Sequence, residues 1–573
     1  MNVVEQVIAL WARLYPVRSY TSGLSTELTH PGAETPEFVQ SAFAEIDALE
    51  DKLQGITDPD QRFTAQRLLV SFRTSLRFPQ PSQGIHTCGD GAFYILLKGD
   101  QQAPWVATYL ESVSEVIAFE TRRWKDEHFS LEIKKTCLNS ADYLTACADS
   151  IRKQNLHGPT IQAACKRLRS QVGKYKALFR APGLETQDVT ALLALFATQD
   201  QAPHRTPGYP EVLADLYNLS SDASTVAPTI KKRAQQWLAQ DMVIVSQLTQ
   251  EIAPQLGSPH DIGTQALWDA IGVRYAVPDV MPLAHQVATV CNEFAAVHLL
   301  DFSSSETVLL QETPSYMTPL ITGGQDLAID YLTDQPKSHL YLTPEKNTSL
   351  LTMLNILVHE FSHGFNFVSS ARYAPPLLNL DTPLQVAMTE GMALYREFEY
   401  YQAAADLLDQ PDRDSVEEAY LNLYGATTEE QTLAIQCARL ETYLWRIARY
   451  LRAIFDVDVH MGEKTYMQFL DWANSTTGLS REFIHGECFS FLSKPGYAPC
   501  YAIPGRVFED AQQFGLRHAV SSMAFNTDAS KMGFYPWSLG EGKLWELARN
   551  RSVVKLYQTR VGCCDSPATK RYQ

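Results

Sequence analysis

The stretch LLTMLNILVHEFSHGFNF, residues 350–367, is the most informative part of the chain. Its apolar residues fall on every side of a helical wheel, which predicts a helix that is buried all round. The same helix carries His359, Glu360 and His363 in the pattern HExxH. Residues four apart share a helix face, so both imidazoles can reach one metal ion while Glu360 lies beside them. A divalent cation would offset the cost of burying these polar groups, although satisfied core histidines in a chance HExxH remain the alternative.

A catalytic zinc ion needs a third protein ligand and an open position for water. Glu390, in the segment TEGMALYRE, opens another helical pattern and suits an acidic ligand that arrives from a neighbouring helix. The alternative for Glu390 is a solvated glutamate at a helix start. Glu397 follows on the same face and is either a residue that supports a metal ligand or a surface glutamate. We therefore expect one Zn²⁺ per chain, bound by His359, His363 and Glu390.

Composition narrows the choice of partners and compartment. The chain has 573 residues, 45% of them hydrophobic, and a formal net charge of −17, which argues against a nucleic acid or an anionic membrane as partner. The most basic segment, Lys166 to Arg180, has the spacing of a solvated helix face. We find no signal peptide and no apolar stretch long enough to span a membrane, and the ten cysteines contain no CxxC pair. We expect a soluble cytoplasmic protein, with Cys563 and Cys564 as free thiols.

The hydrophobic pattern predicts a mainly α protein with a small β-sheet. In residues 1–300, apolar residues recur three or four apart and several helices begin at a proline, with Thr35 as a cap before Pro36. The expected helices are Pro36 to Leu53, Gln61 to Leu76, Pro104 to Trp124, Tyr143 to Gln154, Thr160 to Leu178, Pro228 to Ile252 and Pro282 to Leu300.

Residues 301–573 form the second expected region, which begins with the small sheet in residues 306–342. The runs of strand length are Thr307 to Gln311, Leu327 to Tyr331 and His339 to Leu342, separated by Pro and Gly-Gly. Helices then resume from Ser349, with breaks expected at Pro375-Pro376, Pro411, Gly478 and the stretch Pro495 to Gly505.

Several segments resemble a known family. HEFSH followed by EGMALY resembles the gluzincin metallopeptidases, whose two histidines and downstream glutamate bind zinc. EGMALYRE, RAIFDVDVH (452–460) and PGYAPCY (495–501) are similar to successive blocks of the uncharacterised domain-of-unknown-function family 885. The resemblance covers about residues 300–510 and implies a zincin-like architecture with a deep cleft.

In this resemblance, Arg452, Asp456, His460 and Tyr501 occupy motif positions that line the cleft. A metal hydrolase needs donors where negative charge develops, and His460 and Tyr501 have suitable chemistry. The alternatives are a helix-end histidine, a core tyrosine and a helix ion pair between Arg452 and Asp456. Tyr497, in the same loop as Tyr501, suits loop packing better than a substrate contact.

We expect a metallopeptidase-like hydrolase in which zinc polarises a water molecule and Glu360 accepts its proton. The substrate is a peptide or a small amide, and Leu327 to Leu342 offer a strand edge to an extended chain. One alternative is hydrolysis of a non-peptide amide or ester. The other is a metal-bearing binding protein without turnover, for which Glu360 is not needed. The sequence leaves the oligomeric state open.

Overall fold

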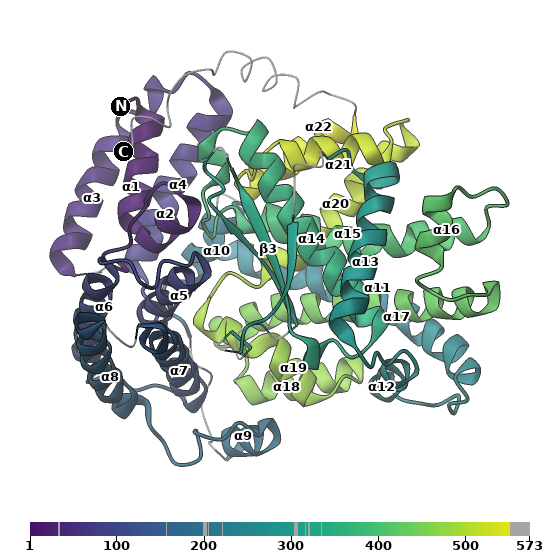
Figure 1. Cartoon of the computed structure of the whole chain (residues 1–573), viewed down its shortest axis with the longest axis horizontal. Helices are drawn as coiled ribbons and strands as arrows, with labels where there is room; N and C mark the ends of the chain where they lie inside the picture. The colour runs from purple at the N-terminus through teal and green to yellow at the C-terminus, as the bar shows by residue number, and fades with distance from the viewer. Residues whose placement is uncertain are drawn as a thin grey trace. The chain divides into compact units, whose positions relative to one another are not determined.

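The chain is mainly α-helical with one three-stranded sheet, as the sequence predicts (Figure 1). The structure is a computed structural model that describes residues 1–32, 35–155, 158–198, 203, 205–219, 222–302, 308–315, 317–318, 321, 323–333 and 335–549. Contacts divide these residues into two compact units. The first consists of Met1–Leu216, Asp458–Leu470 and Cys488–Tyr497, and the second contains the other described residues. The expected division at residue 300 followed the sequence pattern, whereas contacts group residues 217–300 with the second unit.

Helices make up the first unit, and their starts follow ordinary capping chemistry. The Thr35 hydroxyl caps α3 by accepting a hydrogen bond from the Phe38 N–H at 3.3 Å, as predicted. The helices are α1 (Val3–Leu14), α2 (Pro16–Ser22), α3 (Pro36–Glu50), α4 (Pro59–Arg77), α5 (Gln83–Leu97), α6 (Val106–Arg123), α7 (Leu131–Gln154), α8 (Pro159–Phe179), α9 (Val189–Ala197) and α10 (Tyr209–Tyr217).

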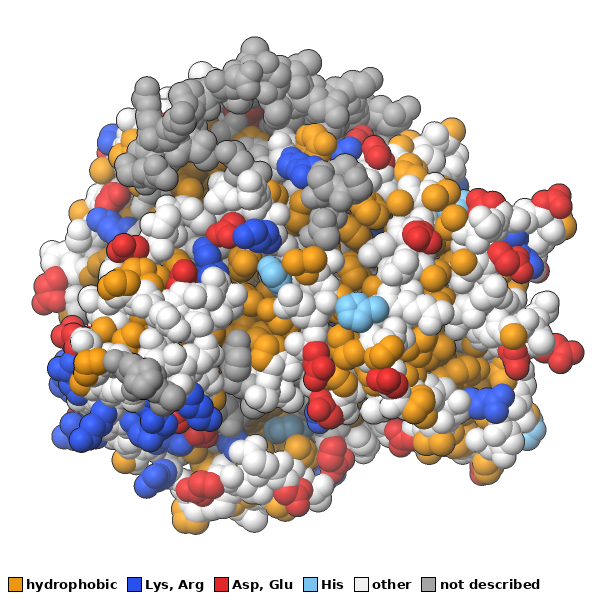
Figure 2. Space-filling view, viewed as in Figure 1, with side chains coloured by type: hydrophobic (Ala, Val, Ile, Leu, Met, Phe, Trp, Pro, Cys, Tyr) orange, Lys and Arg blue, Asp and Glu red, His pale blue; other side chains and the backbone are white. Residues whose placement is uncertain are grey.

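The basic segment Lys166 to Arg180 lies largely on α8. Figure 2 shows Lys and Arg side chains gathered at the surface in this region of the chain. Arg167 and Arg169 are exposed and form ion pairs with Glu111 and Asp149. These pairs agree with the expected solvated helix face.

The second unit contains the sheet and most of the remaining helices. Two predicted helix starts are wrong by a turn or more. α7 begins at Leu131 and not at Tyr143, and α11 begins at Ala223 behind its cap Asp222, so that Pro228 lies inside the helix. The helices are α11 (Ala223–Gln255), α12 (Thr264–Arg274), α13 (Val280–Phe294), α14 (Leu350–Tyr373), α15 (Val386–Leu408), α16 (Ser415–Leu421), α17 (Thr428–His460), α18 (Tyr466–Thr477), α19 (Arg481–Cys488), α20 (Pro499–Arg517), α21 (Ser522–Lys531) and α22 (Trp537–Ala548). The ends of α17, α18 and α19 cross the boundaries between the units.

The sheet has the strand order β1-β3-β2, with β1 at Val308–Glu312, β2 at Gly324–Ile329 and β3 at Lys337–Leu342. β1 pairs with β3 in parallel and β2 pairs with β3 antiparallel. β2 is therefore an edge strand. The sequence predicts the three strands, but it starts the second strand at Leu327, three residues late, because Gly324 is counted as part of the separating Gly-Gly. Thr307, the expected start of the first strand, lies outside the described residues.

Two glycines let the sheet pack closely against α14. A Cβ on Gly324 of β2 would lie 2.6 Å from Cγ2 of Ile356, and a Cβ on Gly364 of α14 would lie 2.7 Å from Oγ of Ser338. Both distances are shorter than the contacts that a Cβ atom normally makes with non-bonded atoms. The absence of side chains at these positions brings β2 and β3 directly onto the helix that carries HExxH.

A similar close approach joins α15 to α20. A Cβ on Gly391 would lie 2.3 Å from Cβ of Pro504, and a Cβ on Gly505 would lie 2.7 Å from Cδ2 of Leu394. The predicted break from Pro495 to Gly505 is therefore wrong in its second half. α20 begins at Pro499 and continues through Pro504, because this tertiary packing overrides the local preference of proline.

The described cysteines are free thiols. Eight of them are buried and none of these forms a disulfide. Cys563 and Cys564 lie outside the described residues. Within the described part of the chain, no helix is both long enough and apolar enough to cross a membrane.

Candidate metal centre

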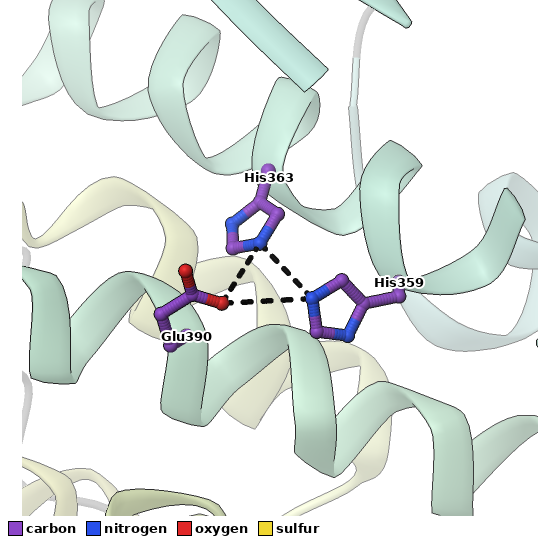
Figure 3. A group of neighbouring side chains, drawn as sticks. All are labelled: His359, His363 and Glu390. Atoms are coloured by element: carbon purple, nitrogen blue, oxygen red, sulfur yellow. Dashed lines mark hydrogen bonds and ion pairs between the residues drawn. The ribbon is translucent and has the colours of Figure 1, made fainter. Parts of the chain in front are cut away.

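The two histidines of HExxH and Glu390 meet at one point in the second unit (Figure 3). His359 and His363 lie one turn apart on α14, and Glu390 lies in the first turns of the neighbouring α15. The two Nε2 atoms are 3.2 Å apart. Oε2 of Glu390 lies 3.5 Å from Nε2 of His359 and 3.3 Å from Nε2 of His363.

This triangle fits a tetrahedral zinc ion. Zinc bonds of about 2.0–2.1 Å to nitrogen and oxygen give ligand-to-ligand separations of roughly 3.3–3.5 Å in a tetrahedron. The donor set of two imidazoles and one carboxylate is one that zinc prefers when a fourth position stays open for water. The residues present therefore fit the expected metal, and the three predicted ligands are brought together.

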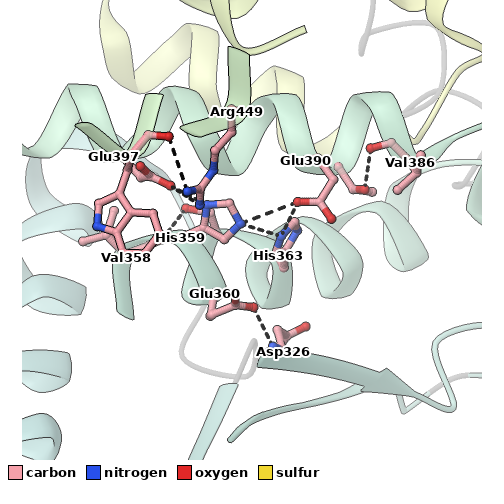
Figure 4. Close-up of polar contacts among 12 residues, drawn as sticks. Asp326, Val358, His359, Glu360, His363, Val386, Glu390, Glu397 and Arg449 are labelled. Atoms are coloured by element: carbon pink, nitrogen blue, oxygen red, sulfur yellow. Dashed lines mark hydrogen bonds and ion pairs between the residues drawn. The ribbon is translucent and has the colours of Figure 1, made fainter. Parts of the chain in front are cut away.

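Glu397 supports the first histidine from the opposite side of the imidazole (Figure 4). Its Oε1 lies 2.7 Å from Nδ1 of His359, and its other oxygen accepts a hydrogen bond from Asn355 Nδ2 at 3.2 Å. Arg449 of α17 lies 3.8 Å from the same carboxylate. Glu397 is 2% exposed, so it is the supporting residue and not the surface glutamate of the alternative interpretation.

The pKa shifts of His359 and Glu390 show that the site favours positive charge at the imidazoles. Burial alone would lower the pKa of His359, but hydrogen bonds to Glu390 and Glu397 outweigh it and raise this pKa to about 10. Burial would raise the pKa of Glu390, but the charges and hydrogen bonds of the two histidines lower it instead. The surrounding carboxylates thus favour positive charge at the imidazoles, which is the charge that a bound metal ion would supply.

Glu360 lies beside the triangle and is oriented by the edge strand (Figure 4). The backbone N–H of Asp326 on β2 donates a hydrogen bond to Oε2 of Glu360 at 2.6 Å. Burial raises the pKa of Glu360, and the charges of His359 and His363 and the Asp326 N–H offset part of this rise. A carboxylate that is fixed through one oxygen and has a raised pKa suits the role of a general base.

Sequence reasoning missed three residues around the centre. Asn355 lies one turn before His359 on α14, so its helical spacing was a usable signal. The Asp326 carboxyl accepts a hydrogen bond from Ser338 through one oxygen, while its Oδ2 is shielded from solvent and has no hydrogen-bond partner. Asp326 and Arg449 reach the centre through strand register and helix packing, for which the sequence carries no motif.

Tyr501 and Arg452 lie in the second unit with the centre. The guanidinium of Arg452 lies 4.7 Å from the ring centroid of Tyr501 and forms an ion pair of 2.7 Å with Glu487. Burial and then the negative charge of Glu390 raise the pKa of Tyr501, which puts the phenol within electrostatic range of the metal ligands. Asp456 is fully buried on α17, and its charge also acts on Tyr217.

His460 and Tyr497 belong to the first unit, so the expected position of His460 at the metal centre stays a prediction. Nδ1 of His460 lies 2.8 Å from the Thr206 hydroxyl, and its Nε2 donates to the carbonyl of Phe491 at 3.3 Å. Tyr497 stacks on Phe491 with ring centroids 5.8 Å apart. Stacking of this kind agrees with loop packing, the role favoured for Tyr497 by the sequence.

The fold occurs in other solved structures. No family model matches the chain, and no curated protein matches it. A "putative lipoprotein" from Colwellia psychrerythraea is 13% identical with a TM-score of 0.62, over 96% of this chain and 100% of that one. A "putative lipoprotein of unknown function" from Shewanella oneidensis is 13% identical with a TM-score of 0.66, over 95% of this chain and 98% of that one.

Metallocarboxypeptidase 1 of Trypanosoma cruzi is 12% identical and overlaps over 98% of this chain and 91% of that one. Its TM-score of 0.36 is too low to bear on the fold or the activity of this chain. At these sequence identities the two lipoprotein structures show a common fold and nothing further. The expected cytoplasmic location therefore stays a prediction.

Proposed function

We propose that the chain is a zinc-dependent hydrolase of peptide or amide bonds and a divergent relative of the gluzincin metallopeptidases. The observation that carries this proposal is the triangle of His359, His363 and Glu390, whose edges of 3.2–3.5 Å match a tetrahedral metal site. Glu360 lies next to it with a raised pKa, and a protein that only binds metal has no need of such a group.

The chemistry of the reaction follows from the groups around the triangle. A bound zinc ion would act as a Lewis acid on water and on the substrate carbonyl. Glu360 accepts the proton of the attacking water and then delivers it to the leaving amine. Its Oε2 is held by the Asp326 N–H, which leaves Oε1 for the water. Glu397 holds the imidazole of His359 in position.

Tyr501 is the proposed donor to the oxygen on which negative charge develops. Its raised pKa keeps the phenol protonated, as a hydrogen-bond donor must be. The cation of Arg452 over the ring holds the side chain in place. A donor of this kind is worth most when it is positioned before the reaction begins.

The edge strand β2 is the proposed binding site for an extended peptide. Among the described residues β2 pairs with a strand on one side only, and the N–H of Asp326 donates to Glu360. An extended chain that pairs with this edge would therefore pass the general base. Main-chain pairing would give affinity without selecting a particular side chain.

The experiment compares zinc-loaded wild type with Glu360→Gln on a mixed peptide library, with products identified by mass spectrometry. The amide is nearly isosteric but cannot accept the proton, so zinc content should be unchanged and turnover should fall about 10²- to 10⁴-fold. A chelator should abolish wild-type turnover.

The matched control is Glu441→Gln. Glu441 is also buried and accepts a hydrogen bond from Thr352, but it lies outside the metal triangle. This variant should keep wild-type rates. Equal rates in wild type and zinc-loaded Glu360→Gln would contradict the proposal, and a zinc-loaded wild type that cleaves no peptide and no amide would support a binding protein instead.

A further inference from the structure

A second group of metal-ligating side chains lies in the same unit, where the end of α13 packs with α16. His298 belongs to the π-helical turn Ala295–Leu299 that follows α13. Asp414 is the N-cap of α16, and Glu417 lies in its first turn. Nε2 of His298 lies 3.6 Å from Oδ2 of Asp414 and 4.0 Å from Oε1 of Glu417. These three atoms all lie within 4.8 Å of one another.

Helix capping accounts for only half of the carboxylate oxygens. Oδ1 of Asp414 accepts hydrogen bonds from the N–H groups of Val416 and Glu417 at 2.8 and 2.9 Å. Oε2 of Glu417 accepts from the N–H of Asp414 at 2.8 Å, which completes a capping box. The cap therefore fixes both carboxylates and leaves one oxygen of each directed toward His298.

The imidazole is anchored as firmly as the carboxylates. Its ring stacks on Phe294 with centroids 4.9 Å apart, and Phe294 stacks on Tyr420 of α16 at 4.1 Å. The hydroxyl of Tyr420 donates to the carbonyl of Tyr400 at 2.8 Å. Nε2 of His298 is shielded from solvent and has no hydrogen-bond partner. A shielded polar atom without a partner is costly, so this position calls for one.

Basic side chains do not neutralise the two carboxylates. Among the described residues, no lysine or arginine forms an ion pair with Asp414 or Glu417. The neighbouring Arg413 instead donates to Glu418 at 3.1 Å and to the carbonyls of Leu407 and Gln410. Two carboxylates and an imidazole thus converge without a fixed cation.

We propose that His298, Asp414 and Glu417 bind a second divalent metal ion of the zinc or cobalt class. One imidazole and two carboxylates are ligands of these ions, and the 52% exposure of Asp414 leaves room for water at the remaining positions. Tetrahedral geometry requires the ligand separations, which are 3.6 and 4.0 Å from His298, to close toward about 3.4 Å. Within the described part of the chain this group consists of the three ligands alone, and the role we assign to the ion is to clamp α13 to α16 and not to take part in hydrolysis.

The test counts metal ions in chelator-treated protein titrated with Zn²⁺ and, for its visible absorption, with Co²⁺. Wild type should bind two equivalents, and His363→Ala, which lacks the catalytic centre, should bind one. The double variant His363→Ala/His298→Phe should bind none, because Phe can keep the stack on Phe294 but offers no ligand. Metal should raise the Tm of His363→Ala and leave that of the double variant unchanged.

Two further variants distinguish the loss of metal binding from the loss of the α16 helix cap. Gln at position 417 and Ser at position 414 can still cap α16, but each removes an anionic ligand. Glu417→Gln and Asp414→Ser should therefore weaken the second equivalent at least about tenfold while hydrolysis stays at the wild-type rate. A single equivalent in wild type that is lost in His363→Ala, or a metal content in His298→Phe equal to that of wild type, would overturn the proposal. Both outcomes are independent of whether the first centre hydrolyses peptides, and the comparison of wild type with His298→Phe holds even if His363→Ala does not fold.

Discussion

The two clusters of the second unit use the same kinds of ligand but hold them in different ways. The first is buried on two long helices, and a separate carboxylate, Glu397, orients His359 from behind. The second is half-exposed, and its carboxylates are oriented by the backbone N–H groups of α16. The first also has the buried carboxylate Glu360 next to its ligands. The types of ligand alone therefore indicate a metal site, while burial and a neighbouring general base indicate a catalytic site.

The largest effect should come from removing a ligand of the first cluster. His363→Ala leaves one imidazole and one carboxylate, which do not hold zinc tightly at a site meant for three protein ligands. We expect zinc content to fall by one equivalent per chain and hydrolysis to fall to background. Metal analysis and activity on the same sample check this.

His298→Phe is the matching change in the other cluster and should leave hydrolysis intact. Full zinc content in His363→Ala would contradict the assignment of the ligands. Loss of hydrolysis in zinc-loaded His298→Phe would contradict the distinction between a catalytic cluster and a clamp.

Tyr501→Phe should have the next largest effect. Losing one positioned donor to a developing negative charge typically lowers the rate by about 10²- to 10³-fold. The ring and its contact with Arg452 remain, so zinc content and Tm should stay close to those of wild type. Steady-state kinetics and thermal unfolding measure both quantities.

Tyr395→Phe is the control for a tyrosine with a structural role. Its hydroxyl donates to Glu399 at 2.8 Å in the interior, so this variant should lose stability and keep its rate per folded molecule. If Tyr501→Phe also loses stability and keeps its rate, Tyr501 is a core tyrosine and not a donor to the substrate. His460→Phe tests His460 in the same way. His460 forms hydrogen bonds with Thr206 and Phe491, so a structural role predicts that the variant loses stability and keeps its rate.

The first cluster was predictable because its signal is local. HExxH places two ligands and a base within one helical turn, and Glu390 and Glu397 share the face of one helix. The second cluster joins a π-helical turn to a helix cap far along the chain, and no spacing rule connects His298 to Asp414. The helical class and the three strands followed from hydrophobic periodicity. The break expected before Gly505 failed because packing of Pro504 against Gly391 is a tertiary contact.

Glu397→Gln should weaken zinc binding about 10- to 100-fold, since a carboxylate behind a metal-bound imidazole both orients it and raises its basicity. At saturating zinc the turnover number should change little, because Glu397 does not touch the substrate. Competition with a chelator of known affinity measures the first quantity. Glu441→Gln, a neutralised glutamate away from the ligands, should keep wild-type affinity, and equal affinities in all three proteins would show that Glu397 is only a packing residue.

The smallest predicted effect is a pH dependence with opposite signs in the two regions. The hydrogen bond from the Glu417 N–H lowers the pKa of Asp414 against an opposing effect of burial, and the Val416 N–H and the charge of His298 lower it further. Its stabilising contribution is therefore present above the ordinary pKa of an aspartate and is lost as the pH falls. Burial raises the pKa of Asp326 to about 8, and the Ser338 hydrogen bond and the charge of His363 reduce this rise only in part.

For Asp326 the folded chain keeps a proton that the unfolded chain releases near pH 4, so the free energy of unfolding falls as the pH rises from about 4 to about 8. Asp326→Asn lacks this proton and should gain on the order of 1 kcal/mol relative to wild type between pH 5 and pH 9 in zinc-free protein. Zinc should reduce the difference, because its charge draws the proton from Asp326 at lower pH. Denaturant unfolding at pH 5, 7 and 9, with and without zinc, measures it. A difference that is flat with pH would mean that the Asp326 carboxyl is ionised throughout and that a cation already faces its Oδ2.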